Sequence, residues 1–341
     1  MRTLLLLIAG LAVISVDAGA QPFQVDDVPS VDAVPLAQIK PRSIVFSDRG
    51  SDIAEAGNIF TRFEDWAKAK PTQAQFLTLY PGYTEPNVDV TVDGTKKHIR
   101  EKLHVYVAEA RFLIAKASAS LDLAHFVMLP FVQQLDPAIG HRLISTSDLP
   151  QESDPRMANN ENPQHPWCAS AGVTICVHSS YKLEGRLPVG VALANKIRES
   201  GKKPISDTLE FDSELDMLRP EDVTQRGLPA LTGLATPPVG ALDQSIFFVN
   251  EVIEFGKMLA VFQQHPSDAN RTVVTVFVLI ALDTAILTKQ EKYANVPVLR
   301  NLLPAQVLAG KSSFNSGNSL SAGLPVYASN QIKAIAALLE K

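Results

Sequence analysis

The chain has 341 residues, of which 46% are hydrophobic, and it carries a formal charge of −5 with an isoelectric point near 5.8. This composition supplies core material for one large domain or two modest ones. It shows no cationic surplus of the kind that nucleic-acid-binding domains carry, so we expect no nucleic-acid partner.

The first segment, residues 1–20, has the features of a secretory signal peptide. Arg2 is the only charge ahead of an apolar run over residues 4–16, and Ala18-Gly19-Ala20 supplies the small residues that signal peptidase accepts. The run is too short to cross ~30 Å of hydrocarbon comfortably, which favours cleavage over a membrane anchor. We therefore expect a soluble protein, periplasmic or secreted, that keeps no stable membrane span.

Residues 21–50 are rich in Val, Asp and Pro without a sustained period, which predicts an extended arm. A helix-rich part is predicted to follow over residues 51–145. Its first helix is indicated by a capping box formed by Asp52 and Glu55 and by apolar residues at helical spacing, and it ends before Pro71.

Two further elements are predicted in this helix-rich part. Alternating valines over residues 88–92, followed by the tight-turn pair Asp93-Gly94, predict a short strand that ends there. Apolar residues at three-four spacing then predict an amphipathic helix over residues 99–117, in preference to a second hairpin strand.

Residues 146–166 are almost free of apolar side chains and predict a polar loop or linker. Residues 167–341 form a sheet-rich part, which could share one domain with residues 51–145. Here β-branched residues predict a strand over 173–177, and Pro188 begins a helix that Gly201 closes.

The most regular pattern in the sheet-rich part lies over residues 209–217, where apolar and acidic residues alternate. A period of two places four carboxylates on one face of a strand, and we interpret that face as solvated rather than as a calcium site. The acidic residues are Glu210, Asp212, Glu214 and Asp216.

Three more segments complete the chain. Residues 246–262 fit either a helix or two strands divided at Gly256, and the Val-rich run over residues 273–282 predicts a strand covered on both faces. Pro325 leads into a C-terminal helix. Together these elements predict an α+β fold, with an antiparallel sheet mainly in the second half packed against helices on one side.

The two cysteines, Cys168 and Cys176, lie eight positions apart around Ala171-Gly172. In an oxidising compartment such a pair favours a disulfide, which on the chain-entropy model would stabilise the fold by roughly 2.5 kcal/mol. A redox-active pair is disfavoured because the C-x-x-C spacing is missing.

Ser179-Ser180-Tyr181-Lys182 contains the Ser-x-x-Lys spacing, in which a lysine can activate a serine. The candidate catalytic residues of a hydrolase are therefore Ser179, Ser180 and Lys182. Such short spacings also arise by chance, and the alternative interpretation is that these residues only form part of a strand.

No metal or cofactor is predicted. Asp122 and His125 have a ligand-like spacing, but no second pair completes a site, which favours a packed or capped core histidine. Residues 305–312 approach a phosphate-binding loop, yet Ala305 stands where that motif requires Gly, which favours a surface loop.

The leading functional hypothesis is a non-catalytic extracytoplasmic binding protein for an apolar or lipid-like small molecule, held between the sheet and the last helix. A serine-lysine type hydrolase and a structural or assembly component that binds a cell-envelope protein are the alternatives. The three differ in what they require: an enclosed apolar cavity, a serine oxygen within hydrogen-bonding reach of a partly buried Lys or His in a cleft, or a large exposed apolar patch.

Overall fold

The computed structural model describes eleven stretches of the chain: residues 22–48, 61–62, 66, 89–92, 95–98, 103–137, 139–144, 175–182, 208–247, 253–283 and 320–341. The expected signal peptide over residues 1–20, the linker over residues 146–166, the helix from Pro188 to Gly201 and the loop over residues 305–312 lie outside these stretches.

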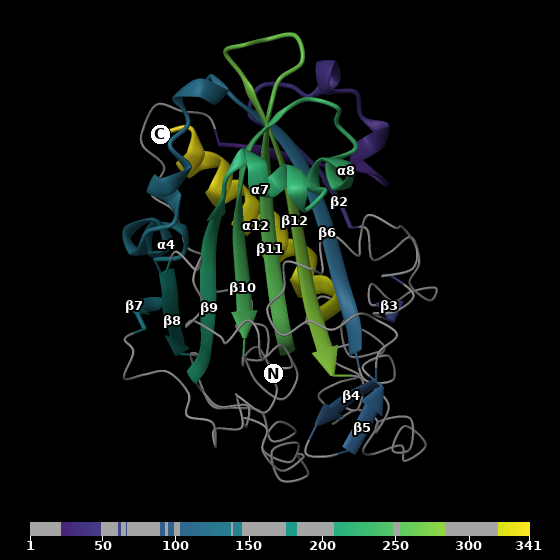
Figure 1. Cartoon of the computed structure of the whole chain (residues 1–341), viewed down its shortest axis with the longest axis vertical. Coiled ribbons are helices and arrows are strands. Elements are labelled where there is room, and N and C mark those ends of the chain that lie inside the picture. The colour runs from purple at the N-terminus through teal and green to yellow at the C-terminus, as the bar shows by residue number, and fades with distance from the viewer. Residues whose placement is uncertain are drawn as a thin grey trace.

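One large sheet of ten strands forms the body of the molecule (Figure 1). Its neighbouring strands are antiparallel, except that the first two are parallel. In order across the sheet they are β1 (Gln24–Asp27), β2 (Ser43–Ser47), β6 (Leu103–Ile114), β12 (Thr272–Asp283), β11 (Ile253–Gln264), β10 (Pro238–Phe247), β9 (Thr208–Leu218), β8 (Ile175–Lys182) and β7 (Gly140–Leu143), and β3 (Thr61–Arg62) also pairs with β6.

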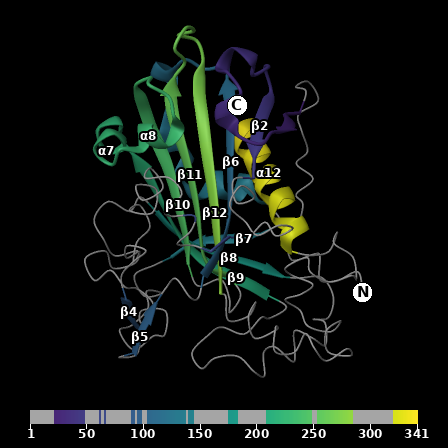
Figure 2. The same cartoon turned by 90° about the vertical axis from the view of Figure 1, so that its right-hand side faces the viewer.

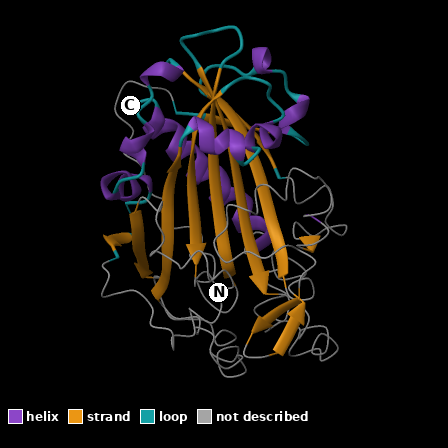
Figure 3. Ribbon diagram, viewed as in Figure 1, coloured by secondary structure: helices purple, strands orange, loops and turns teal. Residues whose placement is uncertain are grey.

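Helices lie on both sides of this sheet. The long helix α12 (Leu320–Leu339) crosses one face, whereas α7 (Pro220–Gln225) and α8 (Leu228–Thr232) lie on the other side (Figure 2). Figure 3 shows that most helical turns gather towards one end of the strands. They include η2 (Val31–Ala33), η3 (Leu36–Gln38), η5 (Ser118–Ser120), η6 (Leu123–Phe126) and α4 (Leu129–Leu135).

Residues with even numbers on β6 face α12. Tyr106 and Phe112 are fully buried there, and they belong to one apolar cluster with Phe262 of β11 and with Ile332 and Leu339 of α12. Among the described residues this is the largest apolar cluster. The face of the sheet that α12 covers, here called the α12 face, is therefore a packed hydrophobic core.

Residues with odd numbers on β6 point to the opposite face, here called the α7/α8 face. Its apolar part joins Val107 of β6 and Leu259 of β11 to Val223 of α7 and Leu228 of α8. Because both faces are covered, the central strands bury almost every side chain, as expected for strands with helices on both sides.

The predicted helix over residues 99–117 is wrong, because residues 103–114 form β6. A strand buried on both faces has apolar residues at consecutive positions, so a three-four spacing can be picked out of it by chance. Val105, Tyr106 and Val107 were the contrary signal, since β-branched and aromatic residues favour strands.

Two strands that flank positions 93 and 94 in the sequence, β4 (Asp89–Val92) and β5 (Thr95–His98), are paired, so the second hairpin strand that was predicted against does form. Residues 61–62 form β3, which contradicts a continuous helix before Pro71 at that point. The expected arm over residues 21–50 contributes β1 and β2 to the sheet.

The α+β class is confirmed. The strands expected over 209–217 and 273–282 are β9 and β12, and the strand expected over 173–177 overlaps the start of β8. Residues 253–264 form β11, in which Gly256 lies inside the strand rather than at a division. The C-terminal helix is α12, with Pro325 inside it.

Two predictions of arrangement need refinement. The sheet draws β1, β2 and β6 from the first half of the chain, and it carries helices on both sides rather than on one. In the described stretches, no helix combines the length and the apolar character required to cross a bilayer.

Candidate functional site

A buried lysine lies in the middle of the α7/α8 face. The antiparallel register of β10 and β11 places Ser245 opposite Lys257 and Asp243 opposite Leu259. Lys257 Nζ donates to Asp243 Oδ2 at 2.6 Å and to Ser245 Oγ at 2.7 Å. These three residues, with Glu214 opposite Ser245 on β9, are here called the Lys257 cluster.

Burial governs the electrostatics of this cluster. Lys257 is only 2% exposed, and removal from water lowers the pKa of its amine, an effect that the negative charge of Asp243 opposes. A buried ammonium is stable only with close partners, and here a carboxylate and a hydroxyl provide them. Such an arrangement is unusual in a sheet interior and marks a functional candidate.

The acidic face of β9 contributes to the same region. Its carboxylates share one face, as the alternation predicted. The expectation that this face is solvated holds for Glu210, which is exposed, but is wrong for Asp212 and Glu214, which are each 3% exposed. Asp212 accepts from His178 Nδ1 of β8 at 2.7 Å when that ring nitrogen is protonated. Burial follows from the position of β9 inside the sheet, between β8 and β10.

The register rows that cross the Lys257 cluster continue into apolar side chains. Lys257 is paired with Leu279 of β12, and Leu279 with Val107 of β6. One row away, Asp243 is followed by Leu259 and then by Phe277. The second row ends in Glu109 of β6, which is paired with Phe277 and fully buried. Lys257 therefore lies at the border between the polar side chains of β9 and β10 and the apolar pair Leu279 and Val107, while β6 adds the buried Glu109 and Arg111 to the same face.

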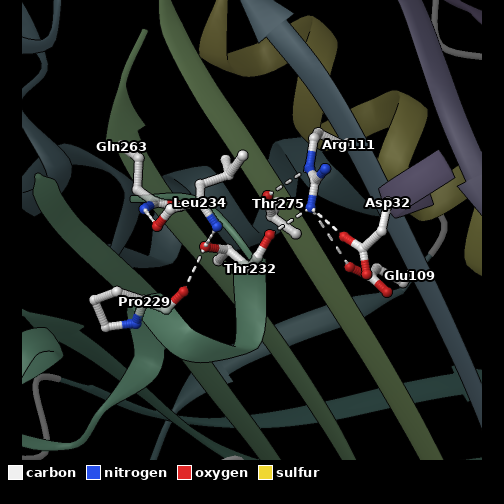
Figure 4. Close-up of polar contacts among 8 residues, drawn as sticks. All are labelled: Asp32, Glu109, Arg111, Pro229, Thr232, Leu234, Gln263 and Thr275. Carbon is white, nitrogen blue, oxygen red and sulfur yellow. Dashed lines mark hydrogen bonds and ion pairs between the residues drawn. The ribbon is translucent and has the colours of Figure 1, made fainter. Parts of the chain in front are cut away.

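A second buried cation closes the end of this face next to α8 (Figure 4). Arg111 Nη2 donates to the carbonyl of Thr232 at 2.6 Å and to Asp32 Oδ1 at 3.1 Å, while its Nε donates to Thr275 at 3.3 Å. Gln263 Nε2 donates to the carbonyl of Leu234. Arg111 thus ties η2 and the end of α8 to the sheet, which is a structural task for a rigid guanidinium.

The predicted candidates Ser179, Ser180 and Lys182 all lie in β8. The side chain of Lys182 lies outside what the structure describes, so the pairing of Ser179 or Ser180 with Lys182 stays a prediction. Ser179 Oγ lies 2.9 Å from Nδ1 of His141 on β7. A partly buried histidine therefore meets the distance criterion that was set for a hydrolase.

The environment of His141 fixes how this pair can work. Burial lowers the pKa of the imidazole, and its Nε2 lies 3.2 Å from the carbonyl of Asp136. A carbonyl only accepts hydrogen bonds, so Nε2 carries the proton and Nδ1 is left to accept from Ser179. Ser179 itself is only 1% exposed.

The other predicted sites are structural or untested. Asp122 accepts from the backbone of Ala124 at the start of η6. His125 contacts the ring of Phe126 but is exposed, so the expectation of a core histidine is wrong. Within the stretches that the structure describes, no group of acidic, His or Cys residues is arranged to hold a metal ion. Cys176 lies opposite Glu214, and Cys168 is outside the described residues, so their disulfide stays a prediction.

Sequence reasoning missed the Lys257 cluster because its members come from three strands, β9, β10 and β11. Asp243 and Lys257 are 14 positions apart, and no short motif joins them. The signal that could have revealed the cluster was the hairpin. Once β10 and β11 are paired, the single lysine of β11 must lie beside β10, which carries Asp243 and Ser245.

No family model matches this chain, and no curated protein matches its sequence. Its structure has distant likenesses among solved structures. The Zhui aromatase/cyclase from Streptomyces sp. R1128 has 10% identity and a TM-score of 0.33, covering 70% of this chain and 94% of the other.

Two further likenesses are of the same kind. Norcoclaurine synthase from Thalictrum flavum, in complex with dopamine and hydroxybenzaldehyde, has 8% identity and a TM-score of 0.29, covering 64% of this chain and 96% of its own. Ara h 8.0201 has 13% identity and a TM-score of 0.25, covering 52% and 77%. These values assign neither a family nor a function to this chain.

Proposed function

We propose that this protein binds a small molecule with an apolar body and one polar group, on the α7/α8 face of the sheet. The observation that carries the proposal is the placement of the Lys257 cluster at the edge of an apolar row formed by Leu279 and Val107. Ligand sites typically combine an apolar lining with a few fixed polar groups. Here the apolar row would contact the body of the ligand, and the Lys257 cluster its polar group.

This location differs from the one expected from the sequence. The space between the sheet and α12 is occupied by a packed core that includes Tyr106, Phe112 and Phe262, all of them fully buried. A ligand there would have to displace well-packed side chains, at a cost of several kcal/mol. The α7/α8 face is also buried, but it adds the fixed polar groups of the Lys257 cluster to its apolar residues, and this combination is why the proposal places the ligand there.

The test is the titration of purified protein with N-phenyl-1-naphthylamine, a fluorescent apolar amine. We expect saturable binding of one molecule per chain, weakened about tenfold or more when Val107→Phe narrows the site. Val326→Phe is the matched control, because Val326 is exposed on α12. Circular dichroism must show that both variants fold. Equal effects of the two substitutions, or no saturable binding, would overturn the proposal.

A serine hydrolase is the second candidate function, because Ser179 lies within hydrogen-bonding distance of a histidine that can act as its base. An alkyl fluorophosphonate should then label Ser179. Ser179→Ala should abolish labelling, whereas Ser180→Ala should preserve it because the neighbouring side chain points to the other face. Absence of labelling in the wild-type protein would remove this candidate.

We also propose that the protein is exported and that signal cleavage leaves Gln21 at its N-terminus. The proposal is supported by the apolar run and small residues before that position. N-terminal sequencing of protein purified from its native host should start at Gln21. Recovery of chains that retain Met1, with Cys168 and Cys176 both reduced, would overturn it.

A role in assembly with a cell-envelope protein has less support. It would call for a large exposed apolar patch, and within the described stretches only Met128, Leu143 and Val326 are exposed large apolar residues.

A further inference from the structure

The Lys257 cluster contains a buried amine that the binding of a polar group does not by itself require. A polar group of a ligand could be held by Ser245 and a backbone amide without an amine in the interior of the sheet. Instead, Nζ of Lys257 lies within 2.7 Å of both a carboxylate oxygen and a hydroxyl, and all three residues are buried. Few placements of a lysine are as costly, and those that persist commonly serve a reaction of the amine.

We infer that Lys257 forms an imine with an apolar aldehyde or ketone bound on the α7/α8 face. The inference rests on the proposed function and deepens it, because it names the polar group of the ligand as a carbonyl. Reactivity comes from the short distance between Nζ and Asp243 Oδ2. In a buried ion pair, a proton can pass from the ammonium to the carboxylate, which leaves a neutral amine beside a carboxylic acid.

Each proton in the reaction has a donor and an acceptor in the cluster. The Lys257 ammonium gives one proton to Asp243, and its free electron pair forms a bond to the carbonyl carbon while the carbon-oxygen π bond opens. The second nitrogen proton moves to the new oxygen, which yields a neutral carbinolamine. Asp243 then protonates the hydroxyl, water leaves as the carbon-nitrogen double bond forms, and the carboxylate is regenerated beside an iminium. No oxidant or reductant is consumed.

Ser245 has a positioning role in this scheme. Its hydroxyl accepts from Lys257 Nζ at 2.7 Å and can in turn donate, so it can carry the second proton from nitrogen to the carbonyl oxygen. Ser245 and Asp243 lie two positions apart on the same face of β10 and therefore hold the amine between them.

The apolar row explains why the carbonyl compound would be apolar. Leu279 lies directly beside Lys257 in the register, with Val107 beyond it, so the carbon chain of a ligand joined to Nζ would extend across β12 and β6. An imine forms by loss of water and is broken down by it, so a site that excludes water favours the adduct. A charged or strongly hydrated carbonyl compound would lose hydration on these leucine and valine side chains.

Treatment with decanal and sodium cyanoborohydride tests the inference, since the hydride converts an imine into a stable secondary amine. Intact mass should show one added decyl group, and peptide mapping should place it on Lys257. We expect labelling of Lys257 to be about tenfold or more faster than that of the partly exposed Lys333. Lys257→Met should remove the fast phase, and Lys333→Met, the matched control, should preserve it.

Two further variants separate the chemistry from the fold. Ser245→Ala and Asp243→Asn should slow labelling of Lys257 about tenfold or more, provided that their circular dichroism matches that of the wild type. Labelling of Lys257 no faster than that of Lys333, or a fast phase that survives in Lys257→Met, would overturn the inference.

Competition with decanol distinguishes the binding function from imine formation, because decanol has the same carbon chain as decanal but no carbonyl group. If decanol displaces N-phenyl-1-naphthylamine while decanal fails to label Lys257, the imine falls and the binding function stands. If neither compound displaces the probe, both fall.

Discussion

The two faces of the sheet are buried to a similar degree, but by different means. On the α12 face, Phe112 and Phe262 pack with helix residues in a continuous apolar core. On the α7/α8 face, apolar residues share the surface with Lys257, Asp243 and Arg111, each of which is buried with polar partners. Apolar packing explains most of the first face, whereas the second contains charges that contribute little net stability and therefore call for a functional explanation.

The largest expected effect is on the α12 face. Phe262→Ala should lower the free energy of unfolding by about 3–5 kcal/mol, because a fully buried aromatic ring is removed and a cavity remains. Urea denaturation measures the change. Val326→Ala on the exposed side of α12 should change it by less than about 0.5 kcal/mol. A Phe262→Ala loss as small as that of the control would contradict the assignment of this face as the main core.

A second experiment asks whether the charges of the α7/α8 face stabilise the fold. Asp243→Ala should destabilise by about 3 kcal/mol, because it leaves the amine of Lys257 buried without its carboxylate. The double variant Asp243→Leu with Lys257→Met should recover most of that loss, since an apolar pair of similar volume can replace a buried ion pair. Denaturation of the three proteins under one set of conditions measures this. If the double variant is as unstable as Asp243→Ala, the ion pair is needed for stability, and the argument that Lys257 has a functional role is weakened.

A smaller, pH-dependent effect is expected from His141 near the edge of the sheet. Burial lowers the pKa of its imidazole in the folded state below the ordinary value of 6.5. The unfolded chain therefore binds the proton more readily, so stability is complete above pH 6.5 and declines as the pH falls towards the lowered pKa. The urea midpoint of His141→Gln should depend less on pH in this range than that of the wild type. Substitution of the exposed His125 by Gln is the matched control, and an equal change in both variants would contradict the assignment.

The smallest effect should come from the ion pair that joins Arg42 to Glu340 of α12, at 2.5 Å. Both side chains are partly exposed, and Arg42 also lies over the ring of Phe23. A double-mutant cycle with Arg42→Met and Glu340→Gln should give a coupling of about 0.2–1 kcal/mol that declines with added salt. A coupling unaffected by salt would point to packing of Arg42 on Phe23 as the main contribution.

Sequence patterns predicted elements well where one face differs from the other. The alternation in β9 and the helical spacing in α12 each follow from a difference between two sides of one element. In β6 both faces are buried, so the two sides of the strand do not differ in polarity. The sequence pattern therefore gave no period of two, and the prediction of a helix was wrong. Burial of Glu214 likewise depends on β8 and β10, which are brought beside β9 only in the folded sheet.

The candidate site was less predictable than the fold, because it depends on strand register. A shift of β10 by one residue would place Asp243 and Ser245 on the α12 face, away from Lys257. Ser179 and His141 are likewise 38 residues apart and meet only across β7 and β8. The local Ser-x-x-Lys spacing directed attention to Lys182, whereas the partner that the structure places beside Ser179 is His141, on another strand.

The pairing of β6 with β12 has a consequence for synthesis of the chain. Arg111 and Thr275, which face one another across these strands, are 164 residues apart. As the chain leaves the ribosome, β6 exposes one unpaired edge, rich in valine and aromatic side chains, until residues near 283 have emerged. A fragment that stops before Thr272 would keep that edge open, and we expect it to aggregate rather than fold.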